Sequence, residues 1–472
     1  MRATLRGLRV LVVGLGTSGR AAAEALLDEG AAVRASEARG VEAIAGESGG
    51  GRALLDRIEF SGGGHRPEHL EGMNLVVVSP GVPERAPILR WAAERDVPVW
   101  SELELGARLC TVPVIAVTGT NGKTTTVEAI AAMLRAGGLR ARACGNVGFP
   151  FSMAVRQPFD ALAVEASSFQ LRFLHTFHPG VSVLLNLAPD HLDWHGSFDA
   201  YAEAKARAFE NQRGDDVHVG NADDENAARV SRTAPCRRRW FGACREGTTP
   251  GDGTWVVSDR LVSVRGGERI DLALPPSARS AALALDAAAA VEAGLAFGLE
   301  EEAVAGGLAD FPELPHRGAV VAEVDGVTFV DDSKATNPHA ALASLEGRRD
   351  VVLVAGGLAK GVELAPLRAA APRLRSVVAL GQATEELARV FRDIVPVRRA
   401  ASMQEAVLLA FEDAGGRGTV LLAPACASQD MFRDYRERGD RFARAARLLG
   451  DAGVPPEGRG TAPVGAGESG DE

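Results

Sequence analysis

Short runs of apolar residues, each followed by Gly, Ser, Asn or Asp, recur along the whole chain. Segments of helical length that are rich in Ala, Leu, Arg and Glu separate these runs. Buried strands that alternate with helices are typical of doubly wound parallel sheets, so the pattern predicts an α/β fold with ligands beyond the carboxyl ends of the strands. The predicted strands are residues 10–13, 75–78, 114–117, 162–164, 181–185, 327–330, 351–354, 377–380 and 419–422.

The length of 472 residues is too great for one hydrophobic core, and it suggests about three domains. One boundary falls near Ser101, before a predicted helix, and another near Leu314, after an acidic helical segment. The chain is therefore expected to divide into residues 1–101, 102–313, 314–453 and 454–472. The last segment is rich in Pro, Gly and Glu, lacks apolar periodicity and is predicted to be disordered. Residues 225–275 contain possible strands but no motif that we can interpret.

Charge and cysteine content narrow the possible functions. A formal net charge of −10 argues against a nonspecific nucleic-acid binder or a membrane-surface protein, since either needs a basic face. The charge does not exclude an anionic small substrate. The five cysteines are scattered without metal-finger spacing, as expected of free thiols in a reducing cytosol. No apolar run reaches the ~18 residues of a membrane span, so we expect a soluble, cytoplasmic protein.

Lysine is rare in this chain. Of the 52 residues that are Lys or Arg, only four are lysine. A chain that otherwise uses arginine retains lysine where a compact charge, or an amine that can lose its proton, is needed. The four positions are Lys123, Lys205, Lys334 and Lys360.

A glycine-rich turn directly follows the first predicted strand. Its residues are Gly14, Leu15, Gly16, Thr17, Ser18 and Gly19. Such a turn opens a helix whose amides can hold a diphosphate, and Glu37 lies where a Rossmann fold places an acidic residue. The same pattern also occurs in nicotinamide or flavin sites and in turns without a ligand. Ser79, Pro80 and Gly81, at another strand end, form either a second ligand turn or a purely structural one.

The central region contains a second glycine-rich loop between a strand and a helix. Its residues are Gly119, Thr120, Asn121, Gly122, Lys123, Thr124 and Thr125. In a P-loop, backbone amides cradle phosphates, a lysine reaches the β/γ oxygens and a hydroxyl binds magnesium. Val117 replaces the first Walker glycine, but a simple turn would leave the rare lysine unexplained. Glu165, at the end of the strand at 162–164, is either a magnesium ligand or an ion-pair partner.

A segment with Asp190 and His191 precedes a predicted helix with Ser197 as its N-cap. The Asp and His residues allow a transition-metal site, but oxygen ligation of a hard cation fits a nucleotide site better. Helical spacing places one set of side chains on a single face, namely Phe198, Tyr201, Lys205 and Phe209. Lys205 is then either a snorkelling side chain or a desolvated amine that reacts with carbon dioxide to form a metal-binding carbamate.

Four C-terminal segments carry cations and hydroxyls, and three of them follow predicted strands. They are residues 314–317, 331–338, 356–361 and 424–432. Each alone is consistent with a surface loop. Because parallel strands end at one edge of a sheet, we expect these segments to converge on a site for a carboxylate-rich substrate.

With these motifs, residues 8–449 resemble the Mur ligase family, and within it the D-glutamate-adding members. Residues 118–125, 165–171 and 186–196 resemble the ATP motifs of the family. The segments that are specific to these members are 332–337, 424–428 and Arg438-Gly439. The resemblance implies three α/β domains: an N-terminal Rossmann-like domain, a central P-loop ATPase-like domain with a parallel sheet, and a C-terminal Rossmann-like domain.

The resemblance also implies an activity. ATP and Mg²⁺ are the implied cofactors, and UDP-N-acetylmuramoyl-L-alanine and D-glutamate are the implied substrates, joined through an acyl phosphate by a monomeric enzyme. The implied catalytic residues are Lys123, Lys205, His191 and Glu165. The implied metal ligands are Thr124, Glu165, His191 and carbamylated Lys205. ATP would contact residues 119–125 together with Arg317, Asp332 and Lys334. The UDP substrate would contact residues 14–19, Glu37, Ser79, Pro80, Gly81 and Asn146. D-glutamate would contact Thr336, Lys360, Ser428 and Tyr435.

Two departures from the family pattern bear on function. Residues 277–281 stand where relatives carry a His-Asn-x-x-Asn helix start beside the adenine, and Tyr435 replaces a phenylalanine. Three alternatives remain at this point. They are a related Mur or folylpolyglutamate-type ligase for another amino acid, a nicotinamide oxidoreductase, and a nucleotide-binding homologue without catalysis.

Overall fold

The computed structural model describes residues 5–46, 51–244, 251–278 and 280–451. The predicted disordered segment 454–472 and Arg279 lie outside the described residues. The chain forms three α/β sheets and divides into two compact units. The first unit comprises residues 1–314 and 360–363, and the second comprises residues 315–359 and 364–472. No helix in the described ranges is long and apolar enough to cross a membrane.

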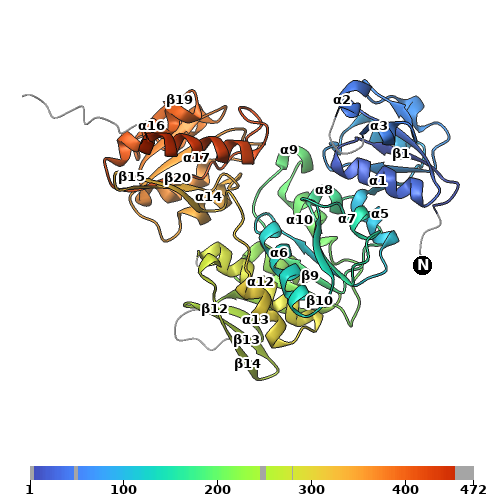
Figure 1. The fold of residues 1–472 in the computed structure, drawn as a ribbon, viewed down its shortest axis with the longest axis horizontal. Helices are drawn as coiled ribbons and strands as arrows, with labels where there is room; N and C mark the ends of the chain where they lie inside the picture. Colours follow the sequence, from blue (N-terminus) through green and yellow to red (C-terminus); the bar gives the residue numbers. More distant parts are fainter. Residues whose placement is uncertain (1–4, 47–50, 245–250, 279, 452–472) are drawn as a thin grey trace, which may run out of the picture. The chain divides into compact units, whose positions relative to one another are not determined.

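The first sheet, drawn in blue in Figure 1, has the strand order β3-β2-β1-β4-β5, and all its pairs are parallel. Its strands are β1 (Arg9–Val13), β2 (Ala32–Ser36), β3 (Glu59–Ser61), β4 (Leu75–Val78) and β5 (Val99–Ser101). Its helical elements are α1 (Thr17–Asp28), α2 (Val41–Ala45), α3 (Gly51–Leu55), η1 (Pro67–Leu70) and α4 (Pro87–Glu94). The order reverses between β1 and β4, and ligands of such sheets bind at the carboxyl ends of the strands at that point.

The second sheet has nine strands in the order β14-β13-β12-β11-β10-β9-β6-β8-β7, and only the β12-β13-β14 portion is antiparallel. The strands are β6 (Val114–Thr118), β7 (Ala141–Gly145), β8 (Ala161–Glu165), β9 (Val181–Leu184), β10 (Val217–Asn221), β11 (Arg237–Ala243), β12 (Gly253–Val257), β13 (Arg260–Arg265) and β14 (Glu268–Ala273). The uninterpreted residues 225–275 thus supply the outer part of this sheet.

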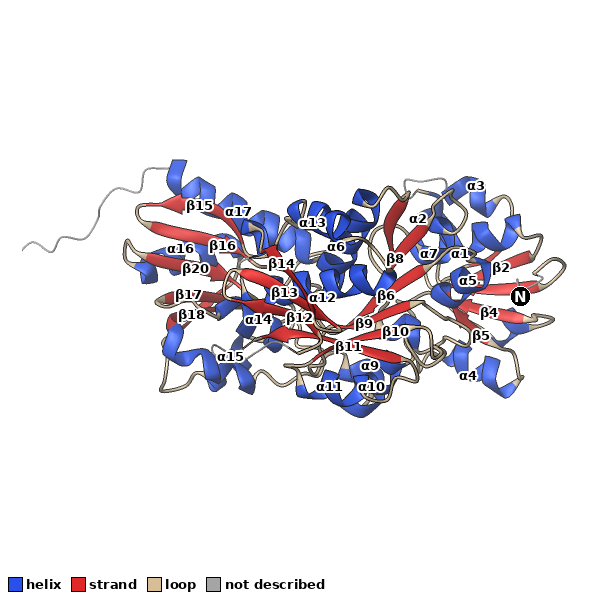
Figure 2. Ribbon diagram, turned by 90° about the horizontal axis from the view of Figure 1, so that it is seen from below, coloured by secondary structure: helices blue, strands red, loops and turns tan. Residues whose placement is uncertain are grey.

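Helices cover both faces of the second sheet, as Figure 2 shows. One face packs against α6 (Lys123–Ala136), α12 (Ala281–Phe297) and α13 (Glu301–Ala309). The other helical elements are α5 (Glu102–Leu109), α7 (Phe151–Ala154), α8 (Ser168–Leu171), α9 (Leu192–His195), α10 (Phe198–Ala206), α11 (Glu225–Ser231) and η2 (Pro276–Ala278). Alternate strand residues therefore enter two separate cores, which is why the strands read as continuous apolar runs.

The outer strands are tied to α12 by a buried carboxylate. Glu292 is 0 % exposed and accepts hydrogen bonds from Arg239 Nε at 2.7 Å and Arg265 Nη2 at 3.0 Å. Thr254 Oγ1 also donates to Glu292, at 2.7 Å. Strands β11, β12 and β13 each contribute one of these donors, so the network fixes the outer strands against the helix.

The third sheet has the order β15-β16-β20-β17-β18-β19 and is parallel except for the edge strand β15. Its strands are β15 (Ala319–Val324), β16 (Val327–Asp331), β17 (Val351–Gly356), β18 (Leu374–Leu380), β19 (Val397–Ala400) and β20 (Gly418–Leu422). Its helical elements are α14 (Pro338–Leu345), η3 (Ala365–Arg373), α15 (Thr384–Val390), α16 (Met403–Ala414) and α17 (Tyr435–Asp451). All nine strands predicted from apolar runs are confirmed.

Candidate active site

The central glycine-rich loop joins β6 to α6. Gly119 and Gly122 have φ angles of 153° and 88°, a backbone conformation that glycine adopts readily. A loop from the neighbouring strand β9 holds this turn, because Asn121 N donates to Asn186 Oδ1 at 2.8 Å and Asn186 Nδ2 donates to Asn121 O at 3.2 Å. Thr120 Oγ1 and the hydroxyl of Tyr201 lie 3.0 Å apart. The loop is therefore fixed from two sides before any ligand binds.

Two lysine amines meet at one carbonyl of this loop. Lys123 Nζ donates to Gly119 O at 2.8 Å, and Lys205 Nζ donates to the same oxygen at 2.7 Å. Lys205 is 1 % exposed, and its amine lies 4.7 Å from the centre of the Tyr201 ring. Burial, with the charge of Lys123 nearby, holds the pKa of Lys205 well below its ordinary value. Lys205 is thus a desolvated amine, and the interpretation as a snorkelling side chain is wrong.

The helix that carries Lys205 has the predicted start and inward face. The Ser197 side chain accepts from Ala200 N, as an N-cap does. Tyr201, Lys205 and Phe209 are buried, and Phe198 packs partly buried against the same core.

Glu165 ends β8 beside the loop. It is buried and accepts from Thr124 Oγ1 at 2.8 Å and from Asn146 Nδ2 at 3.1 Å. The structure thus joins two predicted metal ligands, Thr124 and Glu165, to a predicted substrate ligand, Asn146. Thr125, the other predicted hydroxyl, is fully buried.

His191 lies at the start of α9 with a φ angle of 54°. Its Nε2 atom is 3.8 Å from Asp190 Oδ1, and its ring centre is 4.7 Å from that of Phe169. Burial lowers the pKa of His191 to about 3, so the imidazole is neutral at pH 7 and suited to bind a cation through a ring nitrogen rather than to take up a proton. Lys360, which belongs to the first unit, has its Nζ atom 3.1 Å from Asp190 Oδ1.

The residues fit a magnesium ion in their chemistry. The Thr124 hydroxyl, at the start of α6, lies 2.8 Å from the Glu165 carboxylate, at the end of β8, and both are hard oxygen donors. In the described part of the chain, no three His, Cys, Asp or Glu side chains form a metal cluster.

A buried acid behind the loop was missed in the sequence. Asp286, on α12, is buried, and a Cβ atom built on Gly122 would lie only 2.1 Å from its Oδ1 atom. Its neighbours on the helix are almost all apolar, and a helix that is apolar on every side is typically buried, so this composition could have indicated a buried acid. Asp286 therefore adds a tight contact to the back of the central glycine-rich turn.

The N-terminal turn has the close approach that its glycines predict. A Cβ on Gly19 would lie 1.8 Å from Gly14 O, and Ser79 Oγ donates to Gly14 O at 2.8 Å. Glu37 accepts from Leu15 N at 2.7 Å. Burial raises the pKa of Glu37, but hydrogen bonds from Arg39 and Leu15 N outweigh it and bring the value to about 2. Glu37 thus holds the turn as an anion, and the loops with Gly14 and Ser79 lie side by side.

In the second unit, the loops after β16 and β20 meet. Ala425 N donates to Ala335 O at 2.9 Å, which joins the loop of Thr336 to that of Ser428. Lys334 Nζ lies 4.0 Å from the centre of the Tyr435 ring. Four predicted site residues therefore gather at one edge of the third sheet. Three belong to the predicted D-glutamate set, Thr336, Ser428 and Tyr435, and the fourth, Lys334, belongs to the predicted ATP set.

Asp332 and Arg317 lie at the same edge. Burial raises the pKa of Asp332 to about 6, although a hydrogen bond to Ser344 and the charge of Arg317 oppose the shift. Asp332 is thus a carboxyl group that titrates close to neutral pH.

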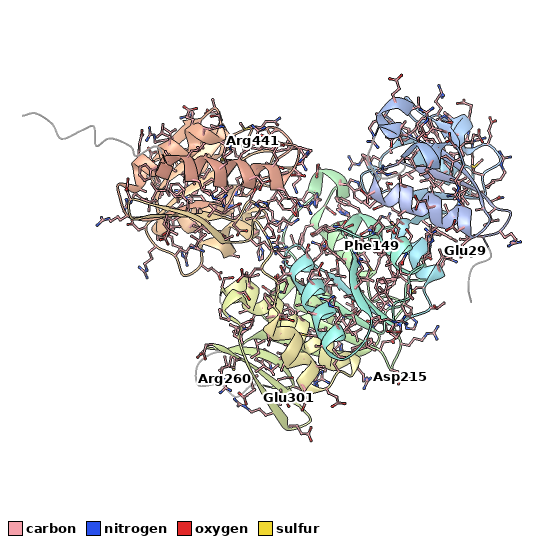
Figure 3. The ribbon with its side chains drawn as sticks, viewed as in Figure 1. Glu29, Phe149, Asp215, Arg260, Glu301 and Arg441 are labelled. Carbon is pink, nitrogen blue, oxygen red and sulfur yellow. The ribbon has the colours of Figure 1, made fainter. Side chains whose placement is uncertain are left out.

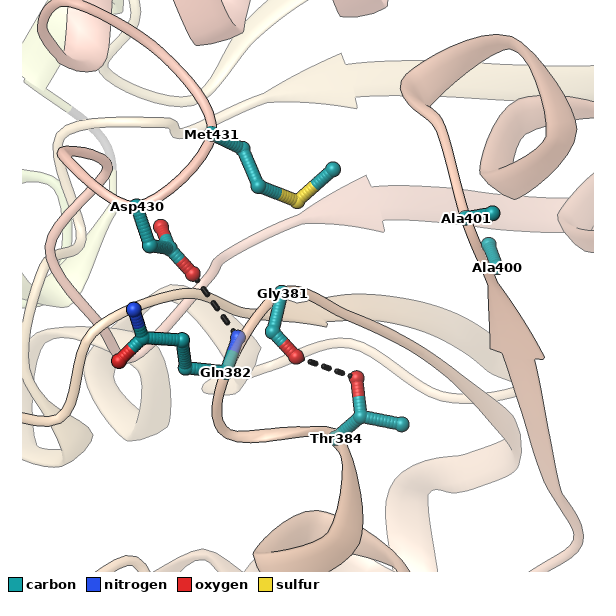
Figure 4. A pocket seen from close by; sticks show the side chains of 7 residues that line it. All are labelled: Gly381, Gln382, Thr384, Ala400, Ala401, Asp430 and Met431. Atoms are coloured by element: carbon teal, nitrogen blue, oxygen red, sulfur yellow. Dashed lines mark hydrogen bonds between the residues drawn. The ribbon is translucent and has the colours of Figure 1, made fainter.

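A pocket of about 460 Å³ lies beyond the ends of β18 and β19 (Figure 4). In it, Asp430 accepts from Gln382 N at 2.9 Å, and Thr384 Oγ1 donates to Gly381 O at 2.7 Å. The remaining lining residues are Ala400, Ala401 and Met431. Asp430 and Met431 belong to the predicted segment 424–432, whereas the turn after β18 and the end of β19 carried no sequence signal. Asp430 follows Ser428 by two residues, so the pocket adjoins the predicted acceptor loop.

Comparison with known proteins covers all three sheets. Three family descriptions match: "Mur ligase MurD-like, N-terminal domain" at residues 8–101, "Mur ligase middle domain" at 117–278 and "Mur ligase, glutamate ligase domain" at 316–426. A protein of Frankia casuarinae named UDP-N-acetylmuramoylalanine--D-glutamate ligase is 46% identical, over 93% of this chain and 94% of its own length. A Streptomyces avermitilis protein of the same name is 41% identical, over 94% and 99%.

Solved structures show the same fold at low identity. A pseudomurein peptide ligase type C from Methanothermus fervidus has a TM-score of 0.59 at 17% identity and covers 93% of this chain and 99% of its own. MurF ligase from Thermotoga maritima, in complex with ADP, has a TM-score of 0.57 at 18% identity, with 96% and 100% covered. These likenesses support the three-domain α/β architecture.

Proposed function

The chain belongs to the Mur ligase family, and from this premise we propose that it joins D-glutamate to UDP-N-acetylmuramoyl-L-alanine, with ATP cleaved to ADP and phosphate. The reaction is a step of peptidoglycan precursor synthesis. We propose that it takes place in the cytoplasm and that the active protein is a monomer. The observation that carries the proposal is the meeting of Lys123 and Lys205 at Gly119 O, beside the Thr124–Glu165 pair. Two relatives, both named UDP-N-acetylmuramoylalanine--D-glutamate ligase, match this chain over nearly its whole length, and their name supports the choice of substrates.

The chemistry follows from the resistance of a carboxylate to attack by an amine. Transfer of the γ-phosphoryl group of ATP to the alanyl carboxylate forms an acyl phosphate. The amine of D-glutamate then attacks the acyl carbon, phosphate leaves, and an amide bond remains. Such reactions depend mainly on positioning and on neutralisation of charge.

The residues of the P-loop suit phosphoryl transfer. Backbone amides at the start of α6 would face the phosphates of ATP, and Lys123 is able to exchange its two loop carbonyls, Gly119 O and Thr120 O, for phosphate oxygens. Thr124 and Glu165 would hold magnesium, with His191 and a carbamate of Lys205 as ligands of a second ion. Magnesium, when bound, supplies positive charge that neutralises the transferred phosphoryl group.

Lys205 has the properties that carbamate formation requires. Only a neutral amine attacks carbon dioxide, and burial beside Lys123 favours the neutral form. The carbamate would turn a buried amine into an anion, which the ammonium group of Lys123 and a cation would both stabilise. The absence of arginine from this position is consistent with that chemistry, because guanidinium keeps its proton.

Three of the four proposed acceptor residues lie in the second unit. Thr336, Ser428 and Tyr435 sit around the joined loops of the third sheet, and we assign to them the binding of D-glutamate. Lys360, the remaining member of that set, is paired with Asp190 in the described structure. We therefore propose that Lys360 exchanges this carboxylate for one of the acceptor.

Phosphate release tests the proposal directly. The purified protein is incubated with Mg-ATP and UDP-N-acetylmuramoyl-L-alanine, and each of a panel of D- and L-amino acids is added in turn. We expect release with D-glutamate alone and none from the matched Lys123→Met variant. Release with another amino acid would keep the chemistry but refute the acceptor. No release with any acceptor would favour a nucleotide-binding homologue without catalysis.

A further inference from the structure

Helix α17 packs unusually close to the end of strand β16. A Cβ atom built on Gly439 would lie 2.2 Å from His316 Nδ1 and 2.6 Å from Asp331 Oδ2, so only glycine fits there. The preceding residue, Arg438, is 1 % exposed and is among the largest fully buried side chains of the chain. The close approach of the helix therefore brings a guanidinium group inside the domain.

The hydrogen bonds of Arg438 reach three loops. Nε donates to Ser333 Oγ at 3.0 Å and Nη2 to Ser333 O at 2.8 Å, in the loop after β16. Nη1 donates to Cys426 O at 3.0 Å, in the loop after β20, and to Gly356 O at 3.5 Å, at the end of β17. Strands β16, β20 and β17 are consecutive in the third sheet, so the Arg438 side chain fixes the central part of the carboxyl edge of that sheet.

The charge of this guanidinium lacks a bonded counter-ion. Among the described residues, no carboxylate accepts a hydrogen bond from Arg438, and Asp331 and Asp430 act only through space. Burial lowers the pKa of Arg438 to about 10, so the group stays charged at neutral pH. An apolar side chain of similar volume is often at least as stable as a buried charge. The arginine therefore requires an explanation beyond stability of the core.

We propose that Arg438 is a positioning residue for the acceptor amino acid. It holds the two loops that carry Thr336 and Ser428. Among the described residues, no carboxylate forms a hydrogen bond with Arg438, so its positive charge favours an acceptor with two carboxylates. This inference rests on the proposed function, and it adds a residue that does not itself contact the acceptor. The hydroxyl of Ser333 completes the arrangement, because it accepts from Arg438 and donates to Tyr435 O at 2.7 Å.

The test compares Arg438→Lys, which keeps the charge but cannot span three loops, with a matched change on the same helix. The control is Arg441→Lys, an exposed residue labelled in Figure 3 whose ion pair is with Glu437, one turn earlier on the helix. We expect Arg438→Lys to raise KM for D-glutamate about tenfold, which corresponds to ~1.4 kcal/mol. KM for the UDP substrate, whose predicted site lies in the other unit, should change less than about twofold, and Arg441→Lys should leave both constants unchanged.

A purely structural role makes a different prediction. If Arg438→Lys lowers thermal stability while KM for D-glutamate stays at the wild-type value, or if both KM values rise equally, the proposal is overturned. Should that variant fail to fold, Ser333→Ala removes one of the four contacts, and we expect it to raise the same KM about threefold. An unchanged KM for D-glutamate in Ser333→Ala overturns the proposal in that case. Wild-type turnover with D-glutamate, measured first, separates failure of this inference from failure of the proposed function.

Discussion

Replacement of Gly122 by alanine should damage the proposed phosphate-binding loop through two separable effects. The first is backbone strain, since φ at Gly122 is 88° and a Cβ atom destabilises this region by about 1–2 kcal/mol. The second is a collision, since the new Cβ would lie 2.1 Å from Asp286 Oδ1, whereas real Cβ contacts essentially never fall below 3.0 Å. Either the acid or the loop must therefore move by about 0.9 Å.

The expected magnitude follows from that displacement. Overpacking of a tight site typically costs 1–3 kcal/mol, and a shift of about 1 Å in a positioning group can reduce function about a hundredfold. We expect Gly122→Ala to weaken binding of a non-hydrolysable ATP analogue by about a hundredfold. In an Asp286→Ala background the collision disappears and only the strain remains, so the same substitution should weaken binding by about tenfold.

Isothermal titration of the four proteins of this double-mutant cycle measures the two effects. Gly138→Ala is the matched control, because Gly138 has a φ angle of 82° and a Cβ atom added there would have nothing within 4 Å. That variant should lose about 1–2 kcal/mol of stability and keep wild-type affinity. Affinity within about twofold of wild type in Gly122→Ala would refute the reasoning, as would an equal loss with and without Asp286.

Three further predictions concern buried charges. Lys205→Ala should lower turnover by at least ~100-fold, because the proposed metal-binding carbamate is lost. Added short carboxylic acids should restore part of the lost turnover. Wild-type turnover in Lys205→Ala, unchanged by the acids, would contradict the carbamate. Glu292→Gln removes the buried counter-ion that Arg239 and Arg265 share, while Arg239 keeps its second ion pair with Asp252 at 3.6 Å. The substitution should lower the free energy of unfolding in urea, followed by tryptophan fluorescence, by about 3 kcal/mol, whereas a change below ~0.5 kcal/mol would refute the proposed anchor. Burial raises the pKa of Glu102 from 4.5 to about 6, so the folded state keeps this proton longer than the unfolded one. Wild-type stability should then fall by roughly 2 kcal/mol as the pH rises from about 4.5 to above 6, relative to Glu102→Gln, and parallel curves for the two proteins would rule this out.

Much of the fold could be predicted from the sequence because the central strands are buried on both faces. Their side chains are apolar without interruption, as in β4 and β17, and each run is followed by turn residues. Edge strands and the antiparallel extension lack it. Strand β11 begins with three arginines, and one of them, Arg239, is stabilised by Glu292 from a helix far along the chain. A contact of that range leaves no trace in the local pattern.

The site shows the same division. Helical spacing alone predicted that Lys205 points inward, and the structure confirms it, because a helix face is a local property. The burial of Asp286 and the pairing of Lys360 with Asp190 depend on how distant segments pack, and neither could be read from spacing. Arg438 lies in a helix rich in charged residues, where a solvated side chain is the ordinary expectation. Because Gly439 has no Cβ, the helix approaches β16 closely enough to bury the Arg438 side chain.

The central claim, that ATP activates the carboxylate of UDP-N-acetylmuramoyl-L-alanine for attack by D-glutamate, is tested most directly with an oxygen label. The alanyl carboxylate is enriched in ¹⁸O, the reaction is run with Mg-ATP and D-glutamate, and both products are analysed by mass spectrometry. The account predicts an amide product heavier by one glutamyl residue and phosphate that carries one ¹⁸O atom from the substrate. Phosphate without the label, or phosphate formed with no amide product, would contradict it.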